Sequence, residues 1–260
     1  MGDIKEKPTV ETTYPISHHL RELRGRIVKI LLVILIFFIF CYWQSQYIYT
    51  FVTAPIAPLL SDNISLSMLK LTEGFVTELK MCFLAALFIT MPFTLFQFWR
   101  FAAPGLYKEE RRYLVTFVFS ASFLFLAGAA FVYYIVFPLG MRFLTSYASG
   151  EWNISALLSV EFYLSFVLKL MLAFGVVFEL PVIIYFLSKV GLVTTDMLKK
   201  YRRFAIVGIF ILAAALTPPD VISQVAMAFP LILLYEVSIF ITKFSGKKKA
   251  EEIKEVDIYG

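Results

Sequence analysis

The chain has 260 residues, of which 60% are hydrophobic and only 17% charged, and its formal net charge is +5. Apolar runs recur along it, and a run of about 20 residues is what an α-helix needs to cross roughly 30 Å of hydrocarbon. This composition excludes an ordinary soluble domain. We interpret the positive charge as a mark of cytoplasmic loops rather than of a surface that binds nucleic acid.

Six apolar segments follow one another and predict six transmembrane helices. In chain order they are Ile27–Trp43, Met81–Phe98, Tyr113–Phe137, Phe162–Leu187, Phe204–Leu216 and Val225–Ile241. The last two are short, and a helix of the thirteen residues Phe204–Leu216 reaches only about 20 Å. We expect this final hairpin to thin the bilayer locally or to lie behind longer helices.

The lysines and arginines are divided unevenly between the two sides of the membrane. Nineteen of the 24 lie before the first segment, in the second and fourth connections or after the last segment. The odd-numbered connections contain only Lys70 and Arg142, because Lys29, Lys80 and Lys169 fall within or beside helices. Positively charged loops stay in the cytoplasm, so we predict cytoplasmic N- and C-termini and an even number of crossings. The longest outside connection, Gln44–Lys80, contains helix-breaking prolines, and we expect it to form a structured periplasmic cap.

Motifs for nucleotide binding, metal-dependent hydrolysis, a serine nucleophile or a redox dithiol are absent from the sequence. The only histidines, His18 and His19, are adjacent and cannot share a metal ion from one helical face. The only cysteines, Cys41 and Cys82, fall within apolar segments, where thiols act as small hydrophobes. We therefore predict a protein that is not an enzyme and has no cofactor, no metal site and no disulfide.

Two cytoplasmic segments carry acidic residues on a basic face. Residues 19–26 predict a short amphipathic helix before the first span, in which Glu22 and Arg26 can form an ordinary i,i+4 ion pair. Glu109 and Glu110 fall in the first turn of a helix, where acids interact favourably with the helix dipole. Alternatively, these carboxylates select a ligand that presents guanidinium groups, because arginine pairs bidentately with each carboxylate.

The fourth segment places Glu179 inside the bilayer, about 7 Å from the middle of the segment. Pro181 removes a helical hydrogen bond and predicts a kink beside it. Glu179 is either a neutral acid hydrogen-bonded between helices or a functional site, for example a proton relay with Lys169 in a secondary transporter or proton channel. Lys169 is ~15 Å away along a straight helix and rotated by about 80°, so the two do not pair within it.

Six short motifs are spread in a fixed order along almost the whole chain. They are H-L-x-E-L-R at 19–24, Ala54-Pro55, F-x-x-P-x-L-Y-x-x-E-R at 101–111, F-E-x-P at 178–181, T-P-P-D-x-x-S-Q at 217–224 and L-x-x-E at 233–236. Together they resemble the TatC family, the signal-peptide receptors of the twin-arginine protein translocase. Gly105 departs from the alanine of many relatives, which should loosen the turn without removing the site.

The resemblance implies an all-α polytopic fold with six transmembrane helices, both termini in the cytoplasm, short helices 5 and 6, and a periplasmic cap. Residues 1–260 would form one TatC-like membrane domain in the cytoplasmic (inner) membrane of a prokaryote. Within it, residues 1–26 would be a cytoplasmic segment with the amphipathic helix, 27–241 the membrane region and 242–260 a basic cytoplasmic tail.

The resemblance also implies a recognition site for cargo. Glu22 and Glu110 would contact the consecutive arginines of the signal peptide of a folded precursor, with Arg24 and Phe101 shaping that surface. Glu109 is an extra acid that would share this role. A structural scaffold without cargo contact remains an alternative, in which Glu22 and Glu110 could be replaced without loss of export.

A second set of residues is implied to meet other subunits. Glu179 would lie in a concave pocket that faces polar groups of the single-span partners TatA and TatB. Asp220 and Gln224 would belong to the polar turn of the short hairpin, and Pro55 to the periplasmic cap. Contact with membrane lipid, self-association in the receptor complex and export driven by the proton motive force are also implied.

Overall fold

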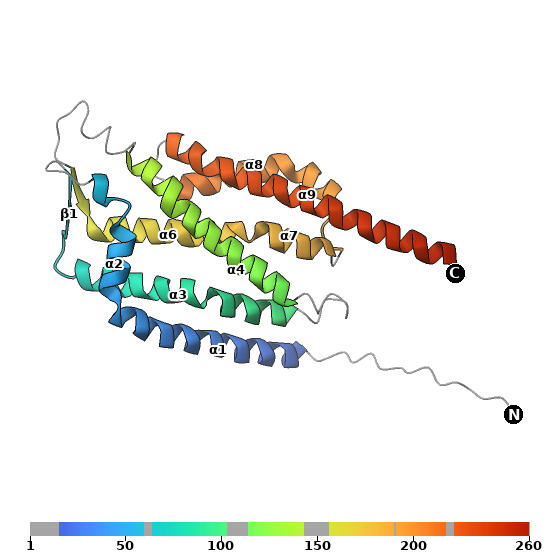
Figure 1. Ribbon diagram of the computed structural model, residues 1–260, viewed down its shortest axis with the longest axis horizontal. Helices are drawn as coiled ribbons and strands as arrows, with labels where there is room; N and C mark the ends of the chain where they lie inside the picture. Colours follow the sequence, from blue (N-terminus) through green and yellow to red (C-terminus); the bar gives the residue numbers. More distant parts are fainter. Residues whose placement is uncertain are drawn as a thin grey trace.

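The structure, a computed structural model, describes residues 16–59, 64–102, 114–142, 156–189, 191–216 and 221–259. Long helices make up most of this part of the chain (Figure 1). In chain order the elements are α1 (Ile16–Trp43), α2 (Ser45–Thr53), the 3-10 helix η1 (Ala57–Leu59), β1 (Ile64–Ser67), α3 (Glu73–Ala102), α4 (Leu114–Phe131), the π-helix η4 (Val132–Val136), β2 (Ala156–Ser159), α6 (Val160–Phe178), α7 (Leu180–Lys189), α8 (Thr195–Leu216) and α9 (Val221–Tyr259).

Five helical segments of the described chain are long and apolar enough to cross a membrane. They are Leu20–Trp43, Glu73–Phe101, Val115–Arg142, Val160–Lys189 and Ser223–Lys243. The predicted class, a polytopic helical membrane protein, is therefore confirmed. α8 is not among the five, because its first half carries the charged run of residues 196–203, so the sixth crossing stays a prediction. The start of α1 and the end of α9 lie at the same end of the bundle (Figure 1).

Two predicted segments can be compared with the observed helices. The amphipathic stretch before the first span is the beginning of α1 itself, because neither proline nor a turn residue other than Gly25 interrupts residues 16–43. The fourth span is divided at Glu179 into α6 and α7, as Pro181 predicts. The helix is thus interrupted where it places its intramembrane carboxylate.

One end of the bundle, here called the cap end, is formed by α2, η1, β1 and β2 (Figure 1). β1 and β2 pair in parallel, with Ile64 opposite Ala156 and Ser67 opposite Ser159. The described part of residues 44–80 is therefore folded, as the expectation of a structured cap requires. We call the opposite end, where α1 begins and α9 ends, the terminal end.

Glu73, the first residue of α3, joins the parts of the cap end. Its Oε2 accepts hydrogen bonds from the backbone N–H groups of Leu69 (2.6 Å) and Lys70 (3.1 Å). Its Oε1 accepts from the Ser159 hydroxyl (2.6 Å) and the Glu161 N–H (2.8 Å). The carboxylate thus satisfies donors in the loop before α3 and at the start of α6, and its negative charge lies at the positive ends of both helix dipoles.

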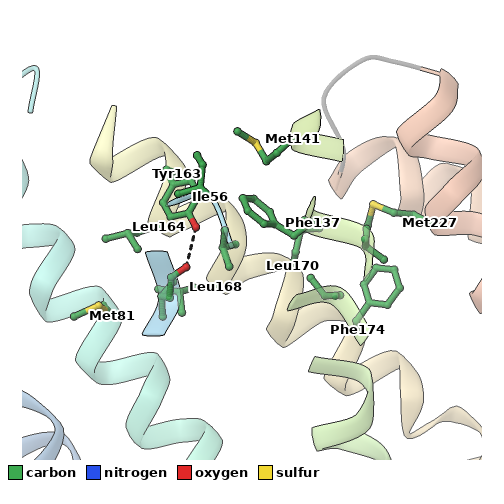
Figure 2. Close-up of a cluster of buried hydrophobic side chains, with 14 of the residues drawn as sticks. Ile56, Met81, Phe137, Met141, Tyr163, Leu164, Leu168, Leu170, Phe174 and Met227 are labelled. Atoms are coloured by element: carbon green, nitrogen blue, oxygen red, sulfur yellow. Dashed lines mark hydrogen bonds between the residues drawn. The ribbon is translucent and has the colours of Figure 1, made fainter. Parts of the chain in front are cut away.

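Tyrosine hydroxyls attach α2 to the long helices. Tyr163 donates to the Val52 carbonyl oxygen (2.8 Å) and Tyr133 to that of Phe51 (2.5 Å), both in the last turn of α2. Figure 2 shows Tyr163 beside Ile56, at the edge of a buried cluster that continues through Phe137 and the apolar side of α6 to α9. The hydrophobic core therefore extends from the cap end into the centre of the bundle.

Candidate functional site

The first candidate site lies at the terminal end, where the start of α1 meets the end of α3. Arg26 donates to Glu22 Oε1 through Nη2 (2.5 Å) and Nε (3.2 Å), so the predicted i,i+4 ion pair is confirmed. The Glu22 side chain is 34% exposed, whereas that of Arg26 is 13% exposed. The carboxylate is therefore presented toward the surface while its cation is covered.

Arg26 also connects this pair to α3. Its Nη1 donates to the backbone oxygen and to Oε1 of Gln97, both at 3.3 Å, and its Nη2 lies 3.5 Å from the Arg100 carbonyl oxygen. The Arg100 carbonyl is in the last turn of α3, where carbonyls lack a helical donor and carry partial negative charge, so it favours a cation. One guanidinium thus fixes the position of Glu22 relative to the end of α3.

An aromatic cluster holds the end of α3 against the neighbouring helices. Trp99 is 4% exposed and its ring centroid lies 5.8 Å from Phe117 of α4 and 4.8 Å from Phe186 of α7. Such ring pairs add to the free energy gained by burying apolar surface. The carbonyls that bind Arg26 are therefore carried by a helix end that is packed on two sides.

The other predicted recognition residues differ in their distance from Glu22 and in their exposure. Phe101 is half-buried in the last turn of α3, directly after Arg100. Arg24 is exposed on α1, two residues from Glu22, so its side chain leaves the helix about 200° away from the carboxylate. Glu109 and Glu110 lie outside the described residues. The structure brings Glu22 and the end of α3 together and leaves Arg24 on another face.

Sequence reasoning missed Gln97, which supplies two of the acceptors of Arg26. A signal was present, because Gln97 is the only amide side chain in the apolar segment Met81–Phe98. It lies near the C-terminal end of that segment, just before a basic connection. An amide there needs a polar partner, but its partner is 71 residues away in sequence.

Glu179, the second candidate site, lies at the break between α6 and α7. Its side chain is buried, with the residue 5% exposed, and no described residue donates to its Oε1. Its N–H bonds to the Val176 carbonyl oxygen (3.1 Å), and its own carbonyl accepts from Ile183 (2.9 Å). A carboxylate in this setting needs either a proton or a partner group from another molecule.

A close helix crossing precedes the break. A Cβ added at Gly128 of α4 would lie 2.7 Å from the Phe174 carbonyl oxygen of α6, and one at Gly175 would lie 2.6 Å from the Phe125 ring. Both distances are shorter than van der Waals contact. Glycine at these two positions therefore allows α4 and α6 to approach closely enough to fix the helix segment that ends at Glu179.

Two of the remaining predicted partner residues are described, Gln224 at the start of α9 and Pro55 after α2. Gln224 of α9 donates from Nε2 to the Phe210 carbonyl oxygen of α8 at 3.2 Å, which ties the two helices together. Asp220 lies outside the described residues. Pro55 is partly buried two residues after the end of α2, beside the fully buried Ile56.

The structure does not assemble the alternative proton relay. Lys169 is exposed on α6, whereas Glu179 is buried at its end, ten residues later. That spacing is ~15 Å along the helix axis, too far for an ion pair or for transfer through one water molecule. The transporter interpretation therefore has no geometric support in the described chain.

Comparison with known proteins identifies the family. The sequence model of the family described as Sec-independent protein translocase protein (TatC) matches residues 18–230. The chain belongs to the TatC family. The TatC protein of Helicobacter pylori (strain J99) is 46% identical over 225 residues, which are 86% of this chain and 87% of that protein. The TatC protein of Escherichia coli (strain K12) is 38% identical over 245 residues, 94% of each chain.

A crystal structure described as the twin-arginine translocase receptor TatC has the same fold, with a TM-score of 0.79. It is 38% identical in sequence, and the match covers 88% of this chain and 99% of that one. This TatC-family chain is therefore a component of the Sec-independent protein translocase. It is a multi-pass protein of the inner membrane and belongs to a family of transport proteins that are not enzymes.

Proposed function

We propose that this chain binds the twin-arginine signal peptides of folded precursors at its cytoplasmic face, with Glu22 and Glu110 pairing with the consecutive arginines. One observation carries the proposal: Glu22 Oε1 already binds a guanidinium, that of Arg26, through two nitrogens. The Glu22 carboxylate stands beside the end of α3, and the sequence continues from there to Glu109 and Glu110.

The preference for arginine follows from the shape of the site. Arg26 is held by acceptors on α1 and α3, so Glu22 has a defined direction rather than a mobile one. A guanidinium presents several N–H donors in one plane and can share such a carboxylate, whereas a lysine ammonium acts as a point charge. Phe101 adds apolar surface beside the same helix end, and Arg24 would contact the ligand from the other face of α1.

The buried polar groups support a proposal about partners. Glu179 and the Gln224–Asp220 turn would meet polar groups in the membrane helices of TatA- and TatB-type subunits, with self-association of the receptor in the same complex. The sequence has no nucleotide-binding motif, so we propose that the proton motive force drives export. This arrangement requires both termini in the cytoplasm, Pro55 in a periplasmic cap and one membrane domain.

The test is binding of a fluorescent twin-arginine signal peptide to the purified full-length chain in lipid nanodiscs, measured by anisotropy. We expect the peptide with two lysines to bind at least about tenfold more weakly, and Glu22→Ala or Glu110→Ala to weaken the arginine peptide by a similar factor. Glu78→Ala, which removes a carboxylate at the cap end, is the control. Equal binding of both peptides to the unaltered chain would refute the proposal.

A further inference from the structure

Lys169 lies near the middle of α6, on an exposed face that none of the other described helices covers. Phe162, Lys169 and Val176 follow one another at seven-residue intervals and therefore share one side of the helix. All three are exposed, Phe162 at 63% and Val176 at 51%. In a membrane this face contacts either lipid or another protein.

The depth of Lys169 can be judged from the polar contacts at the cap end. Glu161, in the first turn of α6, pairs with Lys80 at 2.6 Å. Lys169 is eight residues further along the helix, ~12 Å deeper in the bundle. Its four-carbon stem spans only about 6 Å, so the ammonium does not reach the level of the Glu161 pair even when fully extended toward it.

Lys169 has no counter-charge within the described chain. No hydrogen bond or ion pair joins it to a described residue, since Glu161 is paired with Lys80. Glu179 is ~15 Å further along the axis and points about 80° away. An ammonium at this depth is unfavourable without a partner, and such residues in membrane helices pair with groups of opposite charge.

The surroundings of Lys169 permit a second helix to approach. Ser165 lies one turn before it and Ala173 one turn after it, and both are partly buried. Small side chains are enriched where two membrane helices pack closely, because they let the backbones approach. A helix is also the form in which a partner can cover such a face, because its own backbone groups are already hydrogen-bonded.

We propose that the Lys169 face of α6, made up of Phe162, Ser165, Lys169, Ala173 and Val176, binds the transmembrane helix of another protein. That helix would carry an Asp or Glu whose carboxylate pairs with the Lys169 ammonium. Ser165 and Ala173 supply the close approach, and Phe162 and Val176 supply apolar contact on either side. This interaction surface is separate from Glu22 and does not depend on the recognition of a signal peptide.

The experiment measures energy transfer between the full-length chain, labelled on its C-terminal tail, and a labelled synthetic peptide in phosphatidylcholine vesicles. The first peptide is a single transmembrane helix of leucine and alanine with one Glu, placed in the third of its length that lies nearest the cap-end side of the bilayer. The second peptide has Gln at the same position. The expected result is that the Glu peptide binds about tenfold more tightly than the Gln peptide. Lys169→Met should abolish that preference and Lys169→Arg should keep it.

The arginine variant shows that the charge, rather than a change in folding, is responsible. A melting temperature for Lys169→Met that matches the unaltered chain makes the comparison valid, and Lys169→Gln repeats the test if the methionine variant unfolds. The proposal is wrong if the unaltered chain does not distinguish the two peptides, which is the result expected when lipid phosphate neutralises Lys169. It is equally wrong if the preference survives in both neutral variants.

Discussion

The two ends of the bundle use acidic residues in opposite ways. At the cap end, Glu73 is 3% exposed and accepts four hydrogen bonds from backbone and hydroxyl donors. At the terminal end, Glu22 remains 34% exposed and is held through one oxygen by the guanidinium of Arg26. Glu73 thus joins segments of the same chain, whereas Glu22 is fixed in direction and still faces the surroundings.

The difference separates a structural carboxylate from one suited to binding. A ligand could bind Glu73 only if the start of α3, the loop before it and the start of α6 moved apart. Glu22 instead keeps 34% of its side chain exposed. Exposure and the origin of the hydrogen-bond donors, rather than the presence of an acid, therefore distinguish the two roles.

The largest effect is expected from Glu73→Ala. It leaves the N–H groups of Leu69, Lys70 and Glu161 and the Ser159 hydroxyl without their acceptor, so the cap should detach from α3 and α6. We expect the greatest drop in melting temperature of the variants considered, measured in detergent by tryptophan fluorescence. A melting temperature unchanged from the parent would show that the cap end is not held in this way.

The second effect concerns the helix crossing between the two ends. Gly128→Ala places a Cβ 2.7 Å from a backbone oxygen of α6, which cannot yield as a side chain would, and should destabilise the chain by about 1–3 kcal/mol. The control is Gly208→Ala in α8, where a Cβ meets nothing within 4 Å and should leave stability unchanged or raise it by up to ~1 kcal/mol. Equal melting temperatures for the two variants would contradict the close crossing.

Arg26→Lys tests the terminal end. A lysine cannot reach Glu22, Gln97 and the Arg100 carbonyl at once, so Glu22 loses its fixed direction. We expect the twin-arginine peptide to bind about tenfold more weakly, with little change in melting temperature. Arg21→Lys, on the exposed part of the same helix, should leave binding within about twofold. Because both substitutions keep the positive charge, an equal loss in both variants would mean that the contacts of Arg26 do not set the affinity.

The smallest effects come from a matched pair of tyrosines. Tyr163 and Tyr235 each donate to a carbonyl oxygen at 2.8 Å, but Val52 lies in the last turn of α2 and Leu198 in the first turn of α8. Only the Leu198 carbonyl has a helical donor in its own helix. Tyr163→Phe should therefore cost about 1–2 kcal/mol in unfolding free energy and Tyr235→Phe less than about 0.5 kcal/mol. The reverse order would contradict this account.

Local patterns in the sequence predicted the features that depend on neighbouring residues. Long apolar runs located the five membrane-spanning helices, because helix length must match the bilayer, and Pro181 located the break at Glu179. The Glu22–Arg26 pair followed from its spacing.

Features made by distant residues could not be predicted in this way. Glu73 meets Ser159, 86 residues away, and the ion pair of Glu236 is with Arg202 on α8. The π-helix Val132–Val136 has no proline or glycine to mark it. These contacts depend on which helices become neighbours, and periodicity along one helix does not contain that information.

The central claim is that the Glu22 carboxylate binds a cargo arginine directly. A double-mutant cycle tests it, with Glu22→Gln in the protein and citrulline, a neutral analogue of the same shape, for each arginine of the peptide in turn. Our account predicts a coupling free energy of at least about 1 kcal/mol for one of the two arginines and a smaller value for the other. Additive losses at both positions, with no coupling to Glu22, would contradict it.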